Sequence, residues 1–207
     1  MEIGTPKLII VGGSNGSGKT TLCREMVKKY GFRYLGADEF AFKLNPNDVE
    51  SVRIVAAKMF IREIEDSINN KVSIIVESTL SGVSLIKHIK NAKKHGYEVL
   101  CAYIYLDSVE ISILRVKLRV KQGGHNVPEA DIRRRFPRSR LNFWEFYRPI
   151  CHSWELYYNS PEEQNKNIDL VACAKVSLDE QSEELMISDR KQYRLFLESN
   201  GVNYVEN

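Results

Sequence analysis

The sequence predicts an α/β fold in which helices cover both faces of a parallel sheet. Short apolar runs, typical of buried strands, alternate with amphipathic stretches of helical length along most of the 207 residues. A glycine-rich turn joins the first such strand to the first helix. Hydrophobic residues make up 43% of the chain and charged residues 28%, which is ordinary for a globular protein and excludes long disorder or a membrane-embedded body. We therefore expect a single domain over residues 1–207.

The first half of the chain contains four expected strands, each followed by a helix whose apolar residues recur at three- and four-residue steps. Glycines mark two helix ends, at Gly96 and at Gly123-Gly124. The strands are expected at residues 7–13, 32–37, 72–76 and 98–106, and the helices at 20–30, 49–69, 83–95 and 109–121.

The second half is expected to be mainly helical and to end with a small addition to the sheet. Two tightly joined helices are expected, and a surface loop at 159–167 follows them. One or two further strands and a closing helix complete the chain. The two helices are expected at residues 128–140 and 141–158, the strands at 168–176 and 184–187, and the closing helix at 189–199.

The glycine-rich turn fits the phosphate-binding consensus G-x-x-x-x-G-K-[ST] in full. Its glycines let successive amide groups point inward at an anion, and the start of the next helix adds partial positive charge. Lys19 is then placed to bind the β and γ phosphates and Thr20 to ligate Mg²⁺. The pattern predicts a P-loop NTPase or kinase fold that binds ATP and Mg²⁺, with the nucleotide held by Gly13, Ser14, Asn15, Gly16, Ser17, Gly18, Lys19, Thr20 and Thr21.

A dinucleotide-binding turn is a competing interpretation of the same glycines. Asp38 follows Gly18 by twenty residues, where a ribose-binding acid would lie. That interpretation leaves Lys19 and Thr20 without a role. Short-chain dehydrogenases also need a Tyr with a Lys four residues on, and none of the ten tyrosines has one. The phosphate loop is therefore favoured.

Two carboxylates follow expected parallel strands, Asp38 after the second and Glu77 at the end of the third. The carboxyl ends of such strands face the ligand crevice of an open sheet. Asp38 is therefore expected to bind the substrate and to accept the proton of its attacking hydroxyl, whereas Glu77 and Thr79 are expected to bind the substrate. The structural alternatives are a cap or turn role for Asp38 and a simple strand exit into water for Glu77.

Positive charge is concentrated between residues 115 and 140, where nine Lys or Arg face two acids, although the whole chain carries only +3. A lid over the nucleotide, a nucleic-acid surface and a solvated helix face are the competing explanations. Arg115 and Arg119 lie one helical turn apart and can converge on one anion, beside a flexible Gly123-Gly124 joint. We expect a helical lid over about residues 109–158, with both arginines catalytic. No nucleic-acid partner is expected, because the nearby aromatic residues have the helical spacing of a core.

Several ordered motifs together make the chain resemble the zeta-toxin-like P-loop kinases, in particular a bacterial branch known as predicted ATPases. The resemblance covers about residues 6–160. Besides the phosphate loop and Asp38, the motifs are Glu77-Ser-Thr-Leu-Ser-Gly82, Gly123-Gly-His-Asn-Val-Pro128 and Arg133-Arg-Arg.

The resemblance implies ATP-dependent phosphorylation of a small-molecule hydroxyl, which in characterised zeta toxins belongs to a UDP-N-acetylamino sugar. It implies that Lys19 and Thr20 hold ATP and Mg²⁺, that Asp38 is the general base and that Glu77 contacts the sugar. Arg115 and Arg119 would correspond to lid arginines. An antitoxin protein is the partner that such a family suggests. A nucleoside- or nucleotide-type kinase and a non-catalytic ATP-binding switch remain the alternatives.

Cysteine usage and hydropathy bear on location. The four cysteines at positions 23, 101, 151 and 173 form no close pair, which argues against a zinc ribbon and a disulfide framework. The amino terminus lacks the pattern of a signal peptide, and the longest apolar runs are far shorter than a membrane span. We expect a cytoplasmic protein without a membrane partner.

Overall fold

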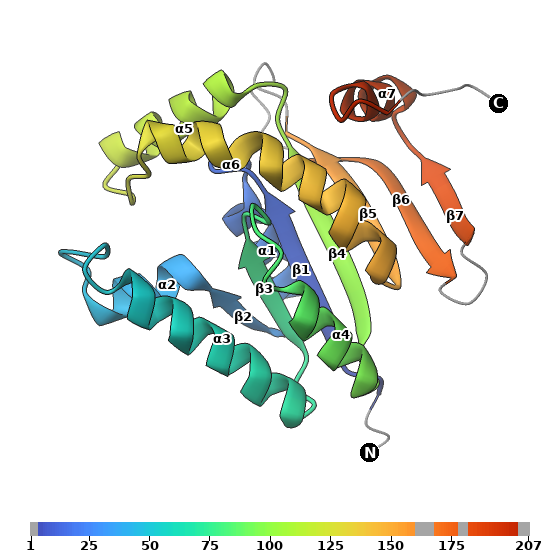
Figure 1. The fold of residues 1–207 in the computed structure, drawn as a ribbon, viewed down its shortest axis with the longest axis horizontal. Coiled ribbons are helices and arrows are strands. Elements are labelled where there is room, and N and C mark those ends of the chain that lie inside the picture. The colour runs from blue at the N-terminus through green and yellow to red at the C-terminus, as the bar shows by residue number, and fades with distance from the viewer. Residues whose placement is uncertain (1–3, 160–167, 178–181, 203–207) are drawn as a thin grey trace.

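The computed structural model describes residues 4–159, 168–177 and 182–202, which form a seven-stranded sheet packed between helices (Figure 1). The strand order is β2-β3-β1-β4-β5-β6-β7. Strands β1 to β5 pair in parallel, whereas β6 and β7 pair antiparallel. The strands are β1 (Lys7–Gly13), β2 (Arg33–Gly36), β3 (Ile74–Ser78), β4 (Glu98–Tyr105), β5 (Ser153–Tyr158), β6 (Asp169–Ser177) and β7 (Ser182–Ile187).

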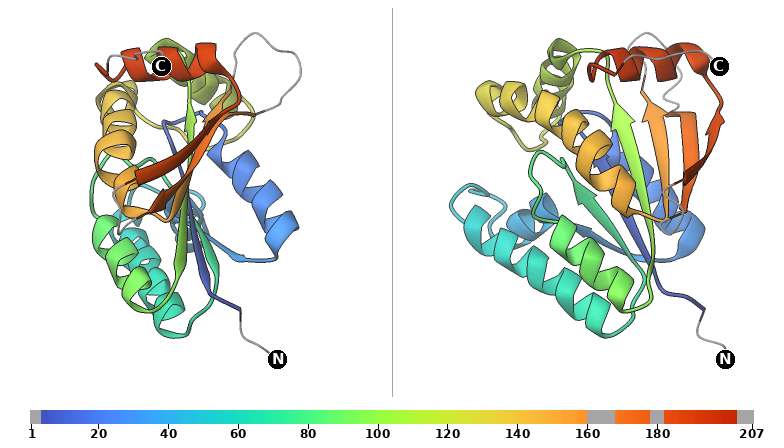
Figure 2. Two further views of the ribbon diagram at one scale, coloured as in Figure 1. Left: turned by 90° about the vertical axis from the view of Figure 1, so that its right-hand side faces the viewer. Right: turned by 45° about the vertical axis from the view of Figure 1, so that its right-hand side comes forward.

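The helices divide unequally between the two faces of the sheet. Figure 2 shows α1 on one face and α3, α4 and α6 on the other. Helix α7 joins the second group, because Phe196 packs against the rings of Phe143 and Trp144. The helices are α1 (Lys19–Tyr30), α2 (Ala37–Leu44), α3 (Arg53–Asn69), α4 (Ile86–Lys94), α5 (Val109–Lys121), α6 (Glu129–Asn142) and α7 (Arg190–Glu198).

Strand β1 is buried on both faces, which explains why it is an unbroken apolar run. Leu8 and Ile10 belong to the cluster under α3 and α4, whereas Ile9 and Val11 belong to the cluster that α1 closes with Met26 and its neighbours. This sandwiching fixes β1 in the centre of the sheet. The glycine-rich turn that follows it is therefore held at the carboxyl edge of the strands.

The connections out of the central strands diverge at that edge. The chain runs from β1 through α1 to β2 on one side of the sheet, and from β4 to β5 on the other side. A divergence of this kind opens a ligand crevice outside the carboxyl ends of the strands. Helices α5 and α6 lie above this edge and α2 lies beside it (Figure 1).

The helix predicted over residues 141–158 is wrong at its end, because residues 153–158 form strand β5. Residues 143–150 continue α6 as irregular helical turns. In β5, Trp154 and Leu156 are buried and alternate with partly exposed neighbours, the period of a strand. Trp154 and Tyr157 also have helical spacing, which produced the wrong prediction. The helical region expected over about residues 109–158 therefore ends at Ile150.

Two smaller differences concern the first helices and the last strands. Residues 37–44 form helix α2, which was not predicted, and its first turn carries Asp38 and Glu39, where negative charge favours a helix start. The strands expected at 168–176 and 184–187 are present, but as an antiparallel extension of the parallel sheet. Within the described parts of the chain, no helix has the length and hydropathy needed to cross a membrane.

Candidate active site

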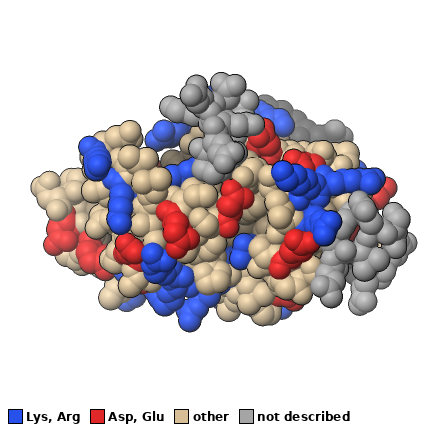
Figure 3. Space-filling view, turned by 90° about the horizontal axis from the view of Figure 1, so that it is seen from above, with Lys and Arg blue, Asp and Glu red and all other residues tan. Residues whose placement is uncertain are grey.

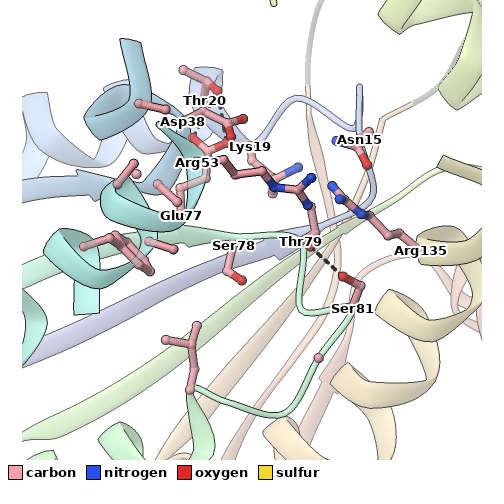
Figure 4. Close-up of a pocket in the computed structure, with 18 of the residues that line it drawn as sticks. Asn15, Lys19, Thr20, Asp38, Arg53, Glu77, Ser78, Thr79, Ser81 and Arg135 are labelled. Atoms are coloured by element: carbon pink, nitrogen blue, oxygen red, sulfur yellow. Dashed lines mark hydrogen bonds between the residues drawn. The ribbon is translucent and has the colours of Figure 1, made fainter. Parts of the chain in front are cut away.

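A cavity of about 790 Å³ opens at the carboxyl edge of the central strands (Figure 4). The glycine-rich loop, α2, α3, the loop after β3, and helices α5 and α6 contribute its walls. Every predicted catalytic and substrate-binding residue lines it, namely Lys19, Asp38, Glu77, Thr79, Arg115 and Arg119. Of the predicted nucleotide-binding residues, the lining includes Asn15, Gly16, Gly18, Lys19, Thr20 and Thr21 but not Gly13, Ser14 or Ser17.

The glycine-rich loop has the conformation of an anion cradle. Gly16 and Gly18 have positive φ angles of 73° and 100°, which favour glycine and turn the loop amides. The side-chain oxygens of Ser14, Asn15 and Ser17 are buried and find no hydrogen-bond partner among the described residues. The turned amides of the loop and its buried Lys19 fit the phosphates of a nucleoside triphosphate.

Lys19 lies buried at the base of this cradle. Its Nζ donates a 2.7 Å hydrogen bond to the carbonyl oxygen of Ser14. Burial lowers the pKa of Lys19, and the charges of Glu77 and Asp38 partly offset that effect. An anionic ligand stabilises such a buried ammonium, because phosphate oxygens supply countercharge.

Glu77 connects the loop to the end of β3. Its two carboxylate oxygens lie 3.2 and 3.0 Å from the Thr20 hydroxyl, and Oε2 also accepts a 2.8 Å hydrogen bond from Tyr34. Because the Thr20 hydroxyl donates a hydrogen bond to Glu77, its oxygen lone pairs remain available for a cation. The Thr20–Glu77 pair therefore fits Mg²⁺. Tyr34 was not among the predicted residues.

Asp38 is exposed in the first turn of α2, directly after β2. Asp38 lines the same cavity as Thr20 (Figure 4). Its charge raises the pKa of Lys19, which places the carboxylate near the phosphate cradle. An exposed carboxylate at this position is accessible to a hydroxyl group that enters the cavity.

The loop after β3 is held rigidly by α6 and by the irregular turn after it. The Asn142 side chain donates to the carbonyl oxygen of Leu80 at 2.8 Å, and the Tyr147 hydroxyl donates to that of Gly82 at 2.7 Å. On this loop, the hydroxyls of Thr79 and Ser81 lie 3.0 Å apart (dashed line in Figure 4). The anchored loop therefore presents a fixed pair of hydroxyls to the cavity.

Helix α5 and the residue after β5 form hydrogen bonds to the glycine-rich loop. Ser112 donates to the carbonyl oxygen of Asn15, and the Asn159 amide donates to that of Ser17 at 2.9 Å. Arg115 donates to Asn159 Oδ1 at 3.2 Å, and burial lowers the pKa of its guanidinium. Neither Ser112 nor Asn159 was among the predicted site residues.

The two lid arginines differ in their surroundings. Arg115 is engaged with Asn159 and Gly16. Arg119 donates through Nη2 to the carbonyl oxygen of His125 at 2.7 Å, but its buried Nε has no partner in the described structure. The charge of Arg119 also lowers the pKa of Lys19. Arg119, which lines the cavity, therefore retains donor capacity within the described structure.

The arginine-rich segment is partly neutralised by its own carboxylates. Arg133 pairs with Glu129 and Glu110, and Asp131 pairs with both Arg134 and Arg135. From above the cavity edge, basic and acidic side chains are interspersed (Figure 3). Such a mixed surface is unlike the continuous basic patch of a nucleic-acid interface.

Arg53 and Arg135 extend into the cavity from opposite walls, and Figure 4 shows their guanidinium groups turned toward each other. Arg53 belongs to α3 and Arg135 to α6. Arg53 was missed by the sequence analysis, since a single arginine at a helix start belongs to no motif. Each of the two arginines also pairs with a nearby carboxylate, Arg53 with Glu50 and Arg135 with Asp131, so together they add partly neutralised positive charge to the cavity wall.

Comparison with known proteins agrees with this geometry. Residues 1–148 match the zeta toxin family. An uncharacterized protein of Haemophilus influenzae is 36% identical over 130 residues, which cover 63% of this chain and 92% of that protein.

Three solved structures show the same fold. A structure from the PezAT chromosomal toxin-antitoxin system of Streptococcus pneumoniae has a TM-score of 0.63 at 18% identity, covering 100% of this chain and 82% of that one. AvrRxo1-ORF1:-ORF2 with ATP has a TM-score of 0.70 at 20% identity, covering 98% and 66%. A kinase-like protein from Chloroflexus aurantiacus has a TM-score of 0.53 at 23% identity, covering 65% and 80%. The chain belongs to the zeta toxin family and is a P-loop phosphotransferase.

Proposed function

We propose that this chain transfers the γ-phosphoryl group of Mg·ATP to a hydroxyl group of a small molecule, with Asp38 as general base. The observation that carries the proposal is that Lys19, Thr20 and Asp38 line one cavity. Phosphoryl transfer needs little more than a phosphate cradle, a metal ligand and a base close to the acceptor, because positioning and charge supply most of the rate.

The residues around the phosphates are proposed to act by position and charge. Lys19 would bind the β and γ oxygens in place of the Ser14 carbonyl, and Thr20 would ligate Mg²⁺ while its hydroxyl stays hydrogen-bonded to Glu77. Mg²⁺, when bound, neutralises charge on the β and γ phosphates. Arg119 would donate to the equatorial oxygens of the γ-phosphate, whereas Arg115 would keep the loop in place.

In the transfer step, Asp38 would take the proton of the acceptor hydroxyl. The acceptor oxygen forms a bond to the γ phosphorus, and the bond from that phosphorus to the bridging β–γ oxygen breaks. ADP leaves with that oxygen, and Asp38 holds the proton until it returns to water. The exposed position of Asp38 supports both its access to the acceptor and this release.

For the acceptor, we propose a nucleotide sugar, specifically a UDP-N-acetylamino sugar. Thr79 and Ser81 offer hydroxyls that can hydrogen-bond to a sugar ring, and Arg53 and Arg135 offer charges that suit a diphosphate. Membership of the zeta toxin family supports this assignment.

The decisive experiment incubates the protein with Mg²⁺ and γ-labelled ATP against a panel of acceptors. The panel contains UDP-N-acetylamino sugars, the free amino sugars, nucleosides and nucleoside monophosphates. Transfer to the nucleotide sugars but not to the free sugars supports the proposal. Transfer to nucleosides or their monophosphates instead would make the protein a nucleoside- or nucleotide-type kinase. ATP binding without any phosphorylated product would indicate a non-catalytic switch.

We also propose an antitoxin protein as partner, supported by the family and by the fold shared with a structure from a toxin-antitoxin system. If the proposed phosphorylation is toxic, induced expression of the wild type arrests growth and expression of Asp38→Asn does not. Unchanged growth under strong expression of the wild type would argue against a toxin.

A further inference from the structure

Tyr34 reaches the active site from an unexpected position. Its hydroxyl donates a 2.8 Å hydrogen bond to Oε2 of Glu77 on the neighbouring strand. The parallel register of β2 and β3 places Gly36 opposite Glu77, and Tyr34 opposite Ile75. The side chain of Tyr34 therefore runs along its own strand and passes over Gly36 to meet the carboxylate.

Gly36 makes this route possible. A Cβ atom at Gly36 would lie 2.4 Å from the hydroxyl oxygen of Tyr34 and 2.9 Å from Cζ of its ring. The backbone at Gly36 is ordinary extended chain with φ −132°, so it does not itself require glycine. The missing side chain is needed for the tyrosine ring, which makes Tyr34 and Gly36 one structural unit.

This unit fixes the position of Glu77 beside the phosphate cradle. Glu77 is the largest of the charges that raise the pKa of Lys19, so its carboxylate lies within electrostatic reach of that ammonium. Burial and the charge of Glu77 raise the pKa of Tyr34 far above its ordinary value, so its hydroxyl remains a donor.

We propose that Tyr34 is a positioning residue, whose hydroxyl passes over Gly36 and holds Glu77 on the hydroxyl of Thr20. Held in this way, Glu77 accepts the hydrogen bond of the Thr20 hydroxyl and leaves the Thr20 lone pairs for Mg²⁺. This role of Tyr34 rests on the proposed function, because it requires that the site binds Mg·ATP.

The test is calorimetric titration of ATP into the wild type and Tyr34→Phe, each with and without Mg²⁺. Loss of an outer-shell partner typically weakens a metal site 10- to 100-fold, so we expect Tyr34→Phe to lose about tenfold of the affinity measured with Mg²⁺. Affinity without Mg²⁺ should change by less than about twofold, since the loop amides and Lys19 are intact.

Tyr157→Phe is the matched control. Tyr157 donates a hydrogen bond of the same length, 2.8 Å, to Glu155 in the same sheet, and neither residue lines the cavity. The control should leave both affinities unchanged. Gly36→Ala provides a second route to the same effect, because the added methyl group displaces the Tyr34 ring. Combining it with Tyr34→Phe should cause no further loss of Mg²⁺-dependent affinity.

Two results would overturn the role of Tyr34. One is a Tyr34→Phe protein that keeps the full gain in affinity from Mg²⁺, and the other is equal weakening with and without Mg²⁺, which indicates general structural damage. If Tyr34→Phe does not fold, Gly36→Ala decides by the same criteria. A wild type that binds no ATP in either condition would overturn the proposed function and this role together.

Discussion

The two sides of the cavity are built in different ways. The nucleotide side is a contiguous loop whose backbone carbonyls are held by Ser112, Arg115 and Asn159. The proposed acceptor side consists of single side chains from distant elements, namely Arg53 on α3 and Arg135 on α6. Nucleotide binding should therefore tolerate the loss of one supporting contact, whereas acceptor recognition should depend on individual side chains.

The largest expected effect comes from Asp38→Asn, which removes the proposed general base. Loss of a general base typically costs roughly 10²- to 10⁴-fold in turnover. Asp38 is exposed and lies outside the glycine-rich loop. The ATP affinity and the melting temperature of Asp38→Asn should therefore stay near those of the wild type. Single-turnover transfer from γ-labelled ATP measures the loss. Glu39→Gln is the control, since Glu39 pairs with Lys43 on the same helix. Full turnover by Asp38→Asn would remove Asp38 as the base.

Lys19→Met removes the central charge of the nucleotide side. Loss of one preorganised charge-stabilising donor typically costs about 10²- to 10³-fold in rate. Lys28→Met on the exposed side of α1 is the control, and it should keep wild-type turnover. Rates of Lys19→Met within about twofold of the wild type would contradict a catalytic role for Lys19.

The same variant should not lower stability, because burial lowers the pKa of Lys19 and so disfavours its charged form in the fold. As the pH rises toward the ordinary value of 10.5, the folded chain loses this proton before the unfolded chain does. Unfolding free energy of the wild type should therefore increase relative to Lys19→Met in that range. Denaturant titrations at several pH values measure the difference, and the opposite trend would contradict the assigned direction.

The nucleotide side was largely predictable from the sequence, and the acceptor side was not. A contiguous motif defines the glycine-rich loop, since spacing alone determines which amides can surround an anion. Tyr34 and Arg53 carry no such signal, because their roles depend on strand register and on the placement of α3 and α6 around one cavity. Contacts of that kind arise only when the chain is folded.

The fold shows the same division. The boundaries of α5 follow from Ser108 as a capping residue and from the glycines after Lys121, and the helix was predicted at the observed position. Strand β5 was predicted as helix, because its aromatic residues fit both periods. Its pairing with β4 and β6, which no local pattern records, determines the outcome.

On the acceptor side, Arg53→Ala and Arg135→Ala should each raise the KM for an anionic acceptor about tenfold, the value of one charge-assisted hydrogen bond. The affinity for ATP should not change. A change in the KM for the acceptor alone would show that the two sides of the cavity act separately. Arg62→Ala is the control on α3, because Arg62 is 84% exposed and only loosely paired with Asp66 at 3.9 Å. Equal effects on ATP and acceptor would indicate that the two sides are not separable.

The smallest effect is expected from Ser112→Ala, which removes one of the contacts on the glycine-rich loop. A single hydrogen bond contributes about 1 kcal/mol, so ATP affinity should fall roughly fivefold or less. Equilibrium binding of ATP measures it, with Ser108→Ala as a control for loss of the α5 cap. Complete loss of binding would mean that the loop depends on this one contact, contrary to the shared support seen in the structure.

The central claim is that this cavity moves a phosphoryl group from ATP to an acceptor hydroxyl. Incubating the wild type and Asp38→Asn with Mg²⁺, γ-labelled ATP and a cellular metabolite extract tests it most directly, with mass spectrometry of the products. We predict a new labelled, phosphorylated metabolite in the wild-type reaction that is strongly reduced with Asp38→Asn. A wild type that binds ATP yet yields no labelled metabolite, or one that yields it equally well without Asp38, would contradict the account.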